Sequence, residues 1–277
     1  MPSPLQIQPA PCAVRHALAL RVLSGCLVAT LLAGCVTETA GAFRGEASRE
    51  AALADYLQLA AAYLGNGDLS NARRHLGNAD QLDPNNSEAA AIWGLVYSRE
   101  GEDQLAEAQF RRALRLDEGN SQARNNYAAF LFAQARYPDA YEQLRQVVSD
   151  TAYAQRPQAF ENLGIAALRL GRVTEAEAAF ARALELDNTL PRASLELSGI
   201  KLDQTDIPAA RQYYRNYLAL MQQQARERDA RGLWQGIRLE AAQGNDDNVL
   251  AYGALLEAGF RASPEYQLYR QLLDTRP

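Results

Sequence analysis

The sequence contains few of the residues that carry metal or redox chemistry. Its 277 residues include only three cysteines and two histidines. Cys12 and Cys26 lie in an apolar leader and the third cysteine is Cys35, so no later thiol is left for a disulfide or a nucleophile. His75 is the only histidine beyond residue 34, and a single histidine does not complete the usual zinc or copper ligand sets. The sequence therefore predicts neither a metal site nor a cofactor.

Motifs for catalysis and for phosphate binding are missing as well. The chain has no G-x-S-x-G, no G-x-x-x-x-G-K-[ST] and no dinucleotide-binding glycine pattern. Its formal net charge is −5 and Lys201 is its only lysine, so it lacks the clustered cations that bind nucleic-acid phosphates. We therefore expect a protein that is not an enzyme, does not bind nucleic acid and takes no small-molecule substrate.

The first 34 residues resemble an export signal rather than part of a fold. Arg15 and Arg21 precede the apolar run Val22–Ala33, which is too short for a membrane-spanning helix but is typical of a secretory signal. The run ends in Leu-Ala-Gly-Cys35, which resembles a bacterial lipoprotein signal and implies cleavage before Cys35 and acylation of that residue. By the same analogy, Val36 favours the outer membrane over the inner one. A signal cleaved elsewhere, or an uncleaved anchor, remains an alternative.

Beyond the leader, small residues recur with a fixed period. Alanine occurs at positions 72, 106, 140, 176 and 210, at steps of 34, 34, 36 and 34 residues. A bulky residue lies four positions after each alanine: Leu76, Phe110, Leu144, Phe180 and Tyr214. A small or turn-forming residue lies five positions before it: Gly67, Gly101, Ala135, Gly171 and Thr205. A period of about 34 residues with small residues at fixed offsets is typical of the tetratricopeptide helix–turn–helix unit.

This period predicts an all-α fold, a right-handed superhelical solenoid of about six tetratricopeptide repeats. We expect a signal peptide over 1–34, which is removed, and a lipidated Cys35 with a flexible tether over 35–50. Five repeats should follow over 51–224, with a divergent sixth repeat and a C-terminal capping helix over 225–277. Solenoids of this kind expose an extended binding surface, so the fold favours a binding function.

The resemblance to tetratricopeptide proteins also implies where a partner would bind. In that family, four positions of the first helix of each repeat line the concave face. Transferred to this chain, the resemblance assigns a partner groove to Leu57, Ala61, Leu64, Ala91, Leu95, Asn125, Phe132, Glu161, Ile165 and Leu168. The set is chiefly apolar, which suits an amphipathic helix or an extended apolar peptide. The alternative is that Leu57, Leu64 and Phe132 pack against neighbouring repeats or the tether, without any partner.

The closing segment suggests a narrower family. Residues 229–240 (DARGLWQGIRLE), Tyr252-Gly253 and residues 263–267 (SPEYQ) resemble the last repeat of the type IV pilus biogenesis lipoproteins of the PilF/PilW (pilotin) family. The resemblance implies an adaptor at the periplasmic face of the outer membrane, anchored by lipid on Cys35. Its partner would be the outer-membrane secretin of the type IV pilus system, whose localisation and multimerisation it would promote. A scaffold for outer-membrane protein assembly or for cell-wall enzymes is the alternative.

Overall fold

The computed structural model describes residues 42–275, which form thirteen α-helices and no strand. Side chains are described from Ser48 onward. The helices are α2 (Ala42–Gly65), α3 (Leu69–Leu82), α4 (Ser87–Glu100), α5 (Asp103–Leu116), α6 (Ser121–Ala133), α7 (Tyr137–Ser149), α8 (Arg156–Arg169), α9 (Val173–Leu186), α10 (Pro191–Asp203), α11 (Ile207–Gln223), α12 (Ala230–Ala241), α13 (Asp246–Phe260) and α14 (Pro264–Asp274). Within this range no helix has both the length and the hydropathy needed to cross a membrane.

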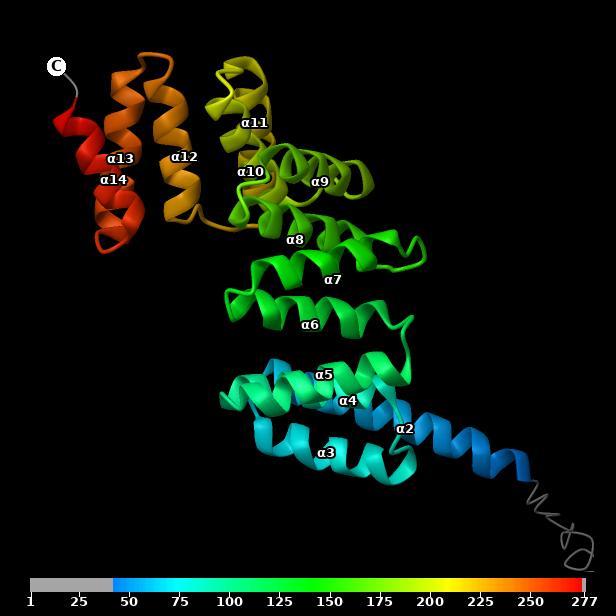
Figure 1. Cartoon of the computed structure of the whole chain (residues 1–277). Coiled ribbons are helices and arrows are strands. Elements are labelled where there is room, and N and C mark those ends of the chain that lie inside the picture. Colours follow the sequence, from blue (N-terminus) through cyan, green and yellow to red (C-terminus); the bar gives the residue numbers. More distant parts are fainter. Residues whose placement is uncertain (1–41, 276–277) are drawn as a thin grey trace, which may run out of the picture. The chain divides into compact units, whose positions relative to one another are not determined.

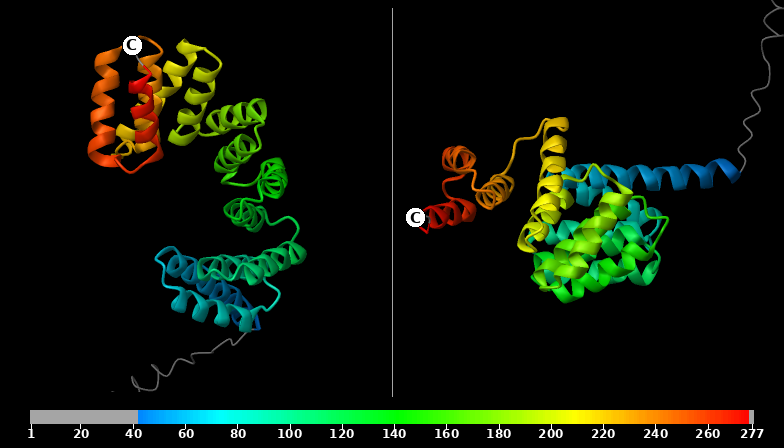
Figure 2. Two further views of the ribbon diagram at one scale, coloured as in Figure 1. Left: turned by 60° about the vertical axis from the view of Figure 1, so that its left-hand side comes forward. Right: turned by 90° about the horizontal axis from the view of Figure 1, so that it is seen from above.

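Successive helices form helix–turn–helix pairs, which can be followed along the ribbon in Figure 1 and from two further directions in Figure 2. The described residues contain six such pairs, from α2–α3 to α12–α13, and α14 packs against both helices of the last pair. Each pair contacts the next, so repeats that are adjacent in the sequence are also adjacent in space. The predicted all-α repeat solenoid is confirmed.

Left-handed residues make the turn inside each of the first five pairs. They stand at the five predicted turn positions: Gly67 (φ 77°), Gly101 (φ 78°), Ala135 (φ 57°), Gly171 (φ 71°) and Thr205 (φ 62°). At the first turn, the N–H of Asp68 donates to the carbonyl of Tyr63 at 2.9 Å and the N–H of Gly67 donates to that of Leu64 at 3.1 Å. This is the Schellman pattern, which satisfies the last carbonyls of a helix and reverses the chain. The same pair of bonds recurs at the other four turns.

The periodic alanines lie in the buried contacts between helices. All five have no exposed surface, and the bulky residues four positions later are buried beside them. Two repeats gain further room from glycine: a Cβ on Gly94 would lie 2.8 Å from the Phe110 ring, and one on Gly164 would lie 2.7 Å from the Phe180 ring. Small residues on one helix therefore make the space that an aromatic ring on the next helix fills.

The predicted tether of residues 35–50 differs in part from the structure. Helix α2 begins at Ala42, so residues 42–50 are helical and continuous with the first repeat. The reason lies in the composition of residues 46–55 (EASREAALAD), which is dominated by strong helix formers. Cys35 and the signal segment lie outside the described residues, and the predictions for them stay predictions. The closing helix, α14, spans Pro264–Asp274, within the range predicted for a capping helix.

Candidate partner-binding groove

The two leucines of the first repeat that the groove assignment includes lie in a packed cluster. Leu57 and Leu64 are only 5% and 6% exposed, and they pack with Leu76, Ile92 and Val96 from α3 and α4. Such side chains offer little surface to another protein. For these two residues the structure favours the alternative, packing between neighbouring repeats, whereas Ala61 on the same helix is exposed.

The second repeat gives a similar result. Ala91 is 3% exposed and packs against Ala113 and Ala123, where α4 meets α5 and α6. Leu95 is half-buried and contacts the clusters on both sides of it. Close packing of this kind holds consecutive repeats together, so it leaves only the outer part of Leu95 for a partner.

The third and fourth repeats bring two groove residues to one cavity. Phe132 of α6 and Ile165 of α8 are half-buried and line a cavity of about 140 Å³. The remaining lining residues come from four helices: Ala128, Ala129, Leu144, Asn162 and Arg192. The cavity is therefore apolar at Phe132 and Ile165, and it is polar at Asn162 of α8 and Arg192 of α10.

Leu168 lies at a second cavity, of about 230 Å³. Helices α8, α10, α12 and α14 all contribute to its lining, which includes Leu195, Gly199, Trp234 and Leu268. Two arginines of α12 also line it, and both are paired with α10: Arg231 with Glu196 at 2.5 Å, and Arg238 with Asp203. Its cationic groups are thus already neutralised by partners in the chain.

Glu161 has a structural use. Its carboxylate accepts a hydrogen bond from the N–H of Ala193 at 2.8 Å, in the first turn of α10. The N-cap residue of that helix, Leu190, has no side-chain acceptor, so Glu161 of α8 caps the helix from outside. Burial raises the pKa of Glu161, and the Ala193 N–H and the charge of Arg192 oppose that rise.

Asn125 is the remaining groove residue, on α6, and its side chain is partly buried. Its Oδ1 atom is shielded from solvent and has no hydrogen-bond partner among the described residues. Leaving a buried acceptor unpaired costs roughly 1–3 kcal/mol. Because the oxygen is shielded from solvent, a partner could not reach it unless the side chain turned outward.

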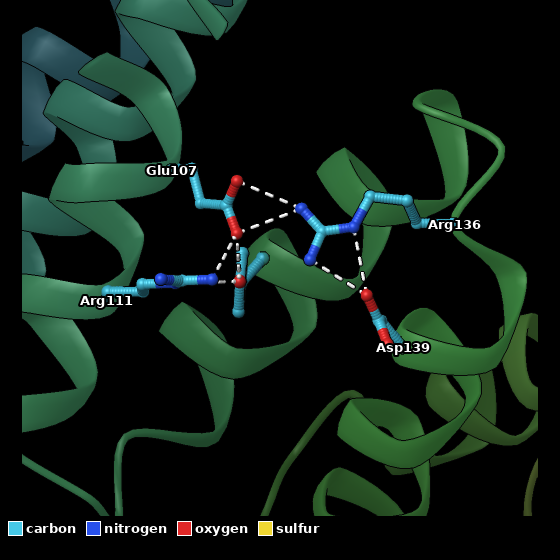
Figure 3. A network of polar contacts seen from close by, with 5 residues as sticks. Glu107, Arg111, Arg136 and Asp139 are labelled. Atoms are coloured by element: carbon cyan, nitrogen blue, oxygen red, sulfur yellow. Dashed lines mark hydrogen bonds and ion pairs between the residues drawn. The ribbon is translucent and has the colours of Figure 1, made fainter. Parts of the chain in front are cut away.

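Polar links join neighbouring repeats, and Figure 3 shows the link between the second and third repeats. The Glu107 carboxylate accepts hydrogen bonds from Arg111 at 2.7 Å, from Tyr127 at 2.9 Å and from Arg136 at 2.9 Å. Arg136 in turn pairs with Asp139 at 2.8 Å. Burial alone would raise the pKa of Glu107, but the hydrogen bonds from Arg136 and Tyr127 outweigh burial and hold the pKa below its ordinary value.

The position of Glu107 in its repeat recurs at the other early junctions. At each one, the residue directly after the periodic alanine reaches the next repeat: Arg73 to Glu100, Glu107 to Arg136, Tyr141 to Glu175, and Glu177 to Lys201. These links are partly exposed, so each contributes little to stability. Their shared position indicates that they help to determine the orientation of one repeat relative to the next.

The groove positions of the fifth repeat fall on Arg192 and Leu195 of α10, which line these cavities. The sequence did not point to the residues of α12 and α14 that complete the second cavity, Trp234 and Leu268 among them. One signal was available in the sequence. Arg231, Trp234 and Arg238 are spaced by three and four residues, which places them on one face of a helix. The divergent sixth repeat was not included in the groove assignment, so that face was not considered.

Paired helices, left-handed turns and alanine contacts in phase define a tetratricopeptide repeat protein. The family model described as "Tetratricopeptide repeat" matches residues 121–191 and 162–229. A relative from Pseudomonas aeruginosa, type IV pilus assembly protein PilF, is 33% identical over 245 residues, which are 88% of this chain and 95% of the relative. This chain belongs to the PilF family of type IV pilus assembly proteins.

Solved structures agree with this assignment. The structure of Pseudomonas aeruginosa PilF superposes with a TM-score of 0.75 at 33% identity, covering 81% of this chain and 99% of that one. The crystal structure of PilW, described as a widely conserved type IV pilus biogenesis factor, gives a TM-score of 0.66 at 26% identity, covering 78% and 97%. The protein is thus a tetratricopeptide protein of pilus biogenesis.

Proposed function

We propose that the protein is a pilotin, an outer-membrane lipoprotein that binds secretin subunits and promotes their localisation and multimerisation for type IV pilus biogenesis. Membership of the PilF family over nearly the whole length of its relative carries this proposal. The adaptor is expected to act at the periplasmic face of the outer membrane.

The two cavities between α6 and α14, each with both apolar and polar lining residues, support a binding role for the repeats. Phe132, Ile165 and Leu168 each line a cavity and remain half-buried rather than filled over by a neighbour. An amphipathic segment of a secretin subunit would bury its apolar side chains there. Among the described residues, no group of histidine, cysteine and carboxylate side chains is placed to hold a metal ion.

The lipid on Cys35 would provide the other half of the mechanism. Each buried CH₂ contributes about 0.8 kcal/mol to membrane binding, and a chain carrying more than one acyl group is anchored stably. Anchoring confines the adaptor and its bound subunit to one surface and raises their effective concentration for assembly. In this mechanism the groove selects the secretin and the lipid carries it to the outer membrane.

The test is an immunoblot for the secretin on unheated membrane fractions. We expect multimers to disappear from the outer membrane when Cys35→Ala replaces the wild-type protein. Cys26→Ala is the matched control, because it removes a leader cysteine without changing the Leu-Ala-Gly-Cys35 sequence. Unchanged multimers in Cys35→Ala would contradict the role of the lipid, and unchanged multimers after deletion of the gene would overturn the adaptor function itself.

A second variant tests the location. The residue after Cys35 is Val36, and by analogy with other bacterial lipoproteins Val36→Asp should retain the protein in the inner membrane. Density-gradient separation of the two membranes should then find the variant, and fewer secretin multimers, in the inner-membrane fractions. Recovery of the wild-type protein itself from the inner membrane would contradict the proposed location.

A further inference from the structure

We propose that the cavity of Phe132 and Ile165 is a specificity pocket: it takes one apolar side chain from a partner segment that also carries a carboxylate, and this carboxylate pairs with Arg192. The inference rests on the proposed function, because it states the chemistry of the segment that the adaptor binds. The acid–apolar pairing is the new element.

The size and lining of the cavity fit a single apolar side chain. Its volume is about 140 Å³, and Phe132, Ile165 and Leu144 supply its apolar walls. An apolar cavity of about 150 Å³ in another protein holds a benzene molecule. A leucine, isoleucine or phenylalanine side chain from a partner would therefore fill much of this space and lose its contact with water.

Arg192 supplies the charge at the same cavity. Its side chain is exposed, and it makes no hydrogen bond or ion pair with any residue in the described part of the chain. The arginines of the neighbouring cavity differ in this respect, since Arg231 and Arg238 are both paired with carboxylates of α10. Arg192 is therefore the lining cation whose guanidinium remains open to a ligand.

The nearby carboxylate of Glu161 does not take that role. One of its oxygens accepts the Ala193 N–H at 2.8 Å, which holds the side chain at the start of α10. The charge of Arg192 opposes the rise that burial causes in the pKa of Glu161, but no hydrogen bond or ion pair joins these two side chains. Charge complementarity at this rim thus points to an acidic group from the partner, because a planar guanidinium binds a carboxylate through two parallel hydrogen bonds.

Asn162 adds a polar contact on the same side. It lines the cavity, is half-buried, and its side chain makes no hydrogen bond within the described residues. A side-chain amide offers both a donor and an acceptor, so it can bond the backbone of an extended segment while that segment inserts its apolar side chain. The expected ligand is an extended peptide with Asp or Glu close to Leu, Ile or Phe.

The first test selects peptides without assuming the partner. A phage-displayed library of random twelve-residue peptides is panned on the purified wild-type protein, on Arg192→Glu and on the control Arg211→Glu. Arg211 is exposed on α11 and does not line the cavity. Wild type and Arg211→Glu should both enrich Asp or Glu beside a large apolar residue, and Arg192→Glu should enrich Lys or Arg instead. Peptides of the same charge on all three proteins would overturn the proposal.

The second test measures affinity for the purified periplasmic part of the secretin. We expect Arg192→Glu to weaken binding at least tenfold and Arg192→Lys by about threefold or less. Ala129→Leu should also weaken binding, because Ala129 is exposed at the cavity and a larger side chain there fills it. Circular dichroism checks that each variant is folded.

The two tests separate the two proposals. If the wild-type protein binds the secretin and the variants at Arg192 and Ala129 bind equally well, the specificity pocket is wrong and the adaptor function stands. If the library yields the acid–apolar motif but the secretin does not bind, the pocket stands and the identity of the partner is wrong. Loss of secretin binding in Ala129→Leu but not in Arg192→Glu would remove the carboxylate from the proposal.

Discussion

The junctions of the first five repeats and the junction between the fifth and sixth repeats use aromatic rings differently. In the second and fourth repeats, Phe110 and Phe180 pack against a glycine of their own repeat, Gly94 or Gly164. At α11–α12 the ring reaches across to the next repeat instead: Tyr214 and Tyr217 of α11 lie against glycines of α12. A ring that faces a glycine thus packs the two helices of one repeat together in the second and fourth repeats, and it packs the fifth repeat against the sixth at α11–α12.

The change from phenylalanine to tyrosine follows from what the ring meets. The far edge of the Phe180 ring lies among apolar side chains, where a tyrosine hydroxyl would have no hydrogen-bond partner. Tyr214 ends at the backbone of α12, and its hydroxyl donates a hydrogen bond to the carbonyl of Gly232 at 3.0 Å. Buried tyrosine hydroxyls need such partners. The junction between the fifth and sixth repeats therefore has a polar contact inside the core in addition to partly exposed ion pairs such as Arg231–Glu196. The polar links described above for the earlier junctions are partly exposed.

The largest expected effect on stability comes from adding a methyl group at a glycine that faces an aromatic ring, either within a repeat (Gly164) or between repeats (Gly236). Gly164→Ala and Gly236→Ala should each lower the free energy of unfolding by roughly 1–3 kcal/mol, because a Cβ would overlap the facing ring. The two variants should differ in the second substitution that restores their stability. The atom nearest a Cβ at Gly236 is the hydroxyl oxygen of Tyr214, so Tyr214→Phe should recover part of the loss. At Gly164 the nearest atoms are ring carbons of Phe180, and Phe180→Leu is needed.

Urea unfolding followed by circular dichroism measures these effects, with the pairs analysed as double-mutant cycles. Gly77→Ala is the matched control: a Cβ there meets nothing within 4 Å, so the helix should gain up to about 1 kcal/mol. Equal stability of Gly236→Ala and wild type would mean that α11 and α12 are packed less closely than the structure has them.

The contacts inside each repeat were predictable because they depend on local spacing. The five alanines, the bulky residues after them and the turn positions before them could be placed from the 34-residue period alone, and all five alanines are fully buried. Even Ala135 and Thr205, which are not turn residues by type, adopt the left-handed conformation that their position requires. The period therefore identifies backbone geometry more reliably than residue type does.

The cavities and the α11–α12 junction were not predictable in the same way, because they depend on how separate helices are turned toward one another. Glu161 falls at a groove position, yet its carboxylate is used to cap a helix 32 residues further along the chain. Leu57 falls at an equivalent position and is buried by α3 and α4. Arg192 lines a cavity whose walls come from four helices. Spacing gives the face of one helix but not what covers that face.

The alkaline unfolding of the protein should sharpen the contrast between phenylalanine and tyrosine junctions. Burial raises the pKa of Tyr217 to about 12, and burial also raises that of Tyr214. In the unfolded chain these groups titrate near 10. Between about pH 10 and 12 the unfolded state loses protons that the folded state keeps, so stability should be complete below pH 10 and fall as the pH rises.

Urea midpoints at pH 9 and pH 11, with tyrosinate absorbance at 295 nm, test this expectation. Tyr217→Phe removes one of the two titrating groups from the junction and should reduce the difference between the two midpoints. Phe180→Leu is the control, because it changes an aromatic contact that has no hydroxyl and should leave the difference as in wild type. An unchanged pH dependence in Tyr217→Phe would show that the hydroxyl reaches solvent in the folded protein.

The smallest expected effect concerns the turns, where the regular repeats have glycine and the fifth has threonine. The φ angles of Gly171 and Thr205 are 71° and 62°, so both residues lie in the left-handed region. That region costs an L-residue roughly 1–2 kcal/mol, which glycine avoids. Glycine is also more flexible in the unfolded chain, and this offsets about 0.5–1 kcal/mol of that gain. Thr205→Gly should therefore raise the free energy of unfolding by up to about 1 kcal/mol, and Gly171→Ala should lower it by a similar amount. Thermal and urea unfolding would measure both changes. In the wild-type protein the Thr205 hydroxyl donates a hydrogen bond to the Gln204 carbonyl at 2.6 Å. If Thr205→Gly were less stable than wild type, this hydrogen bond would outweigh the strain of the backbone.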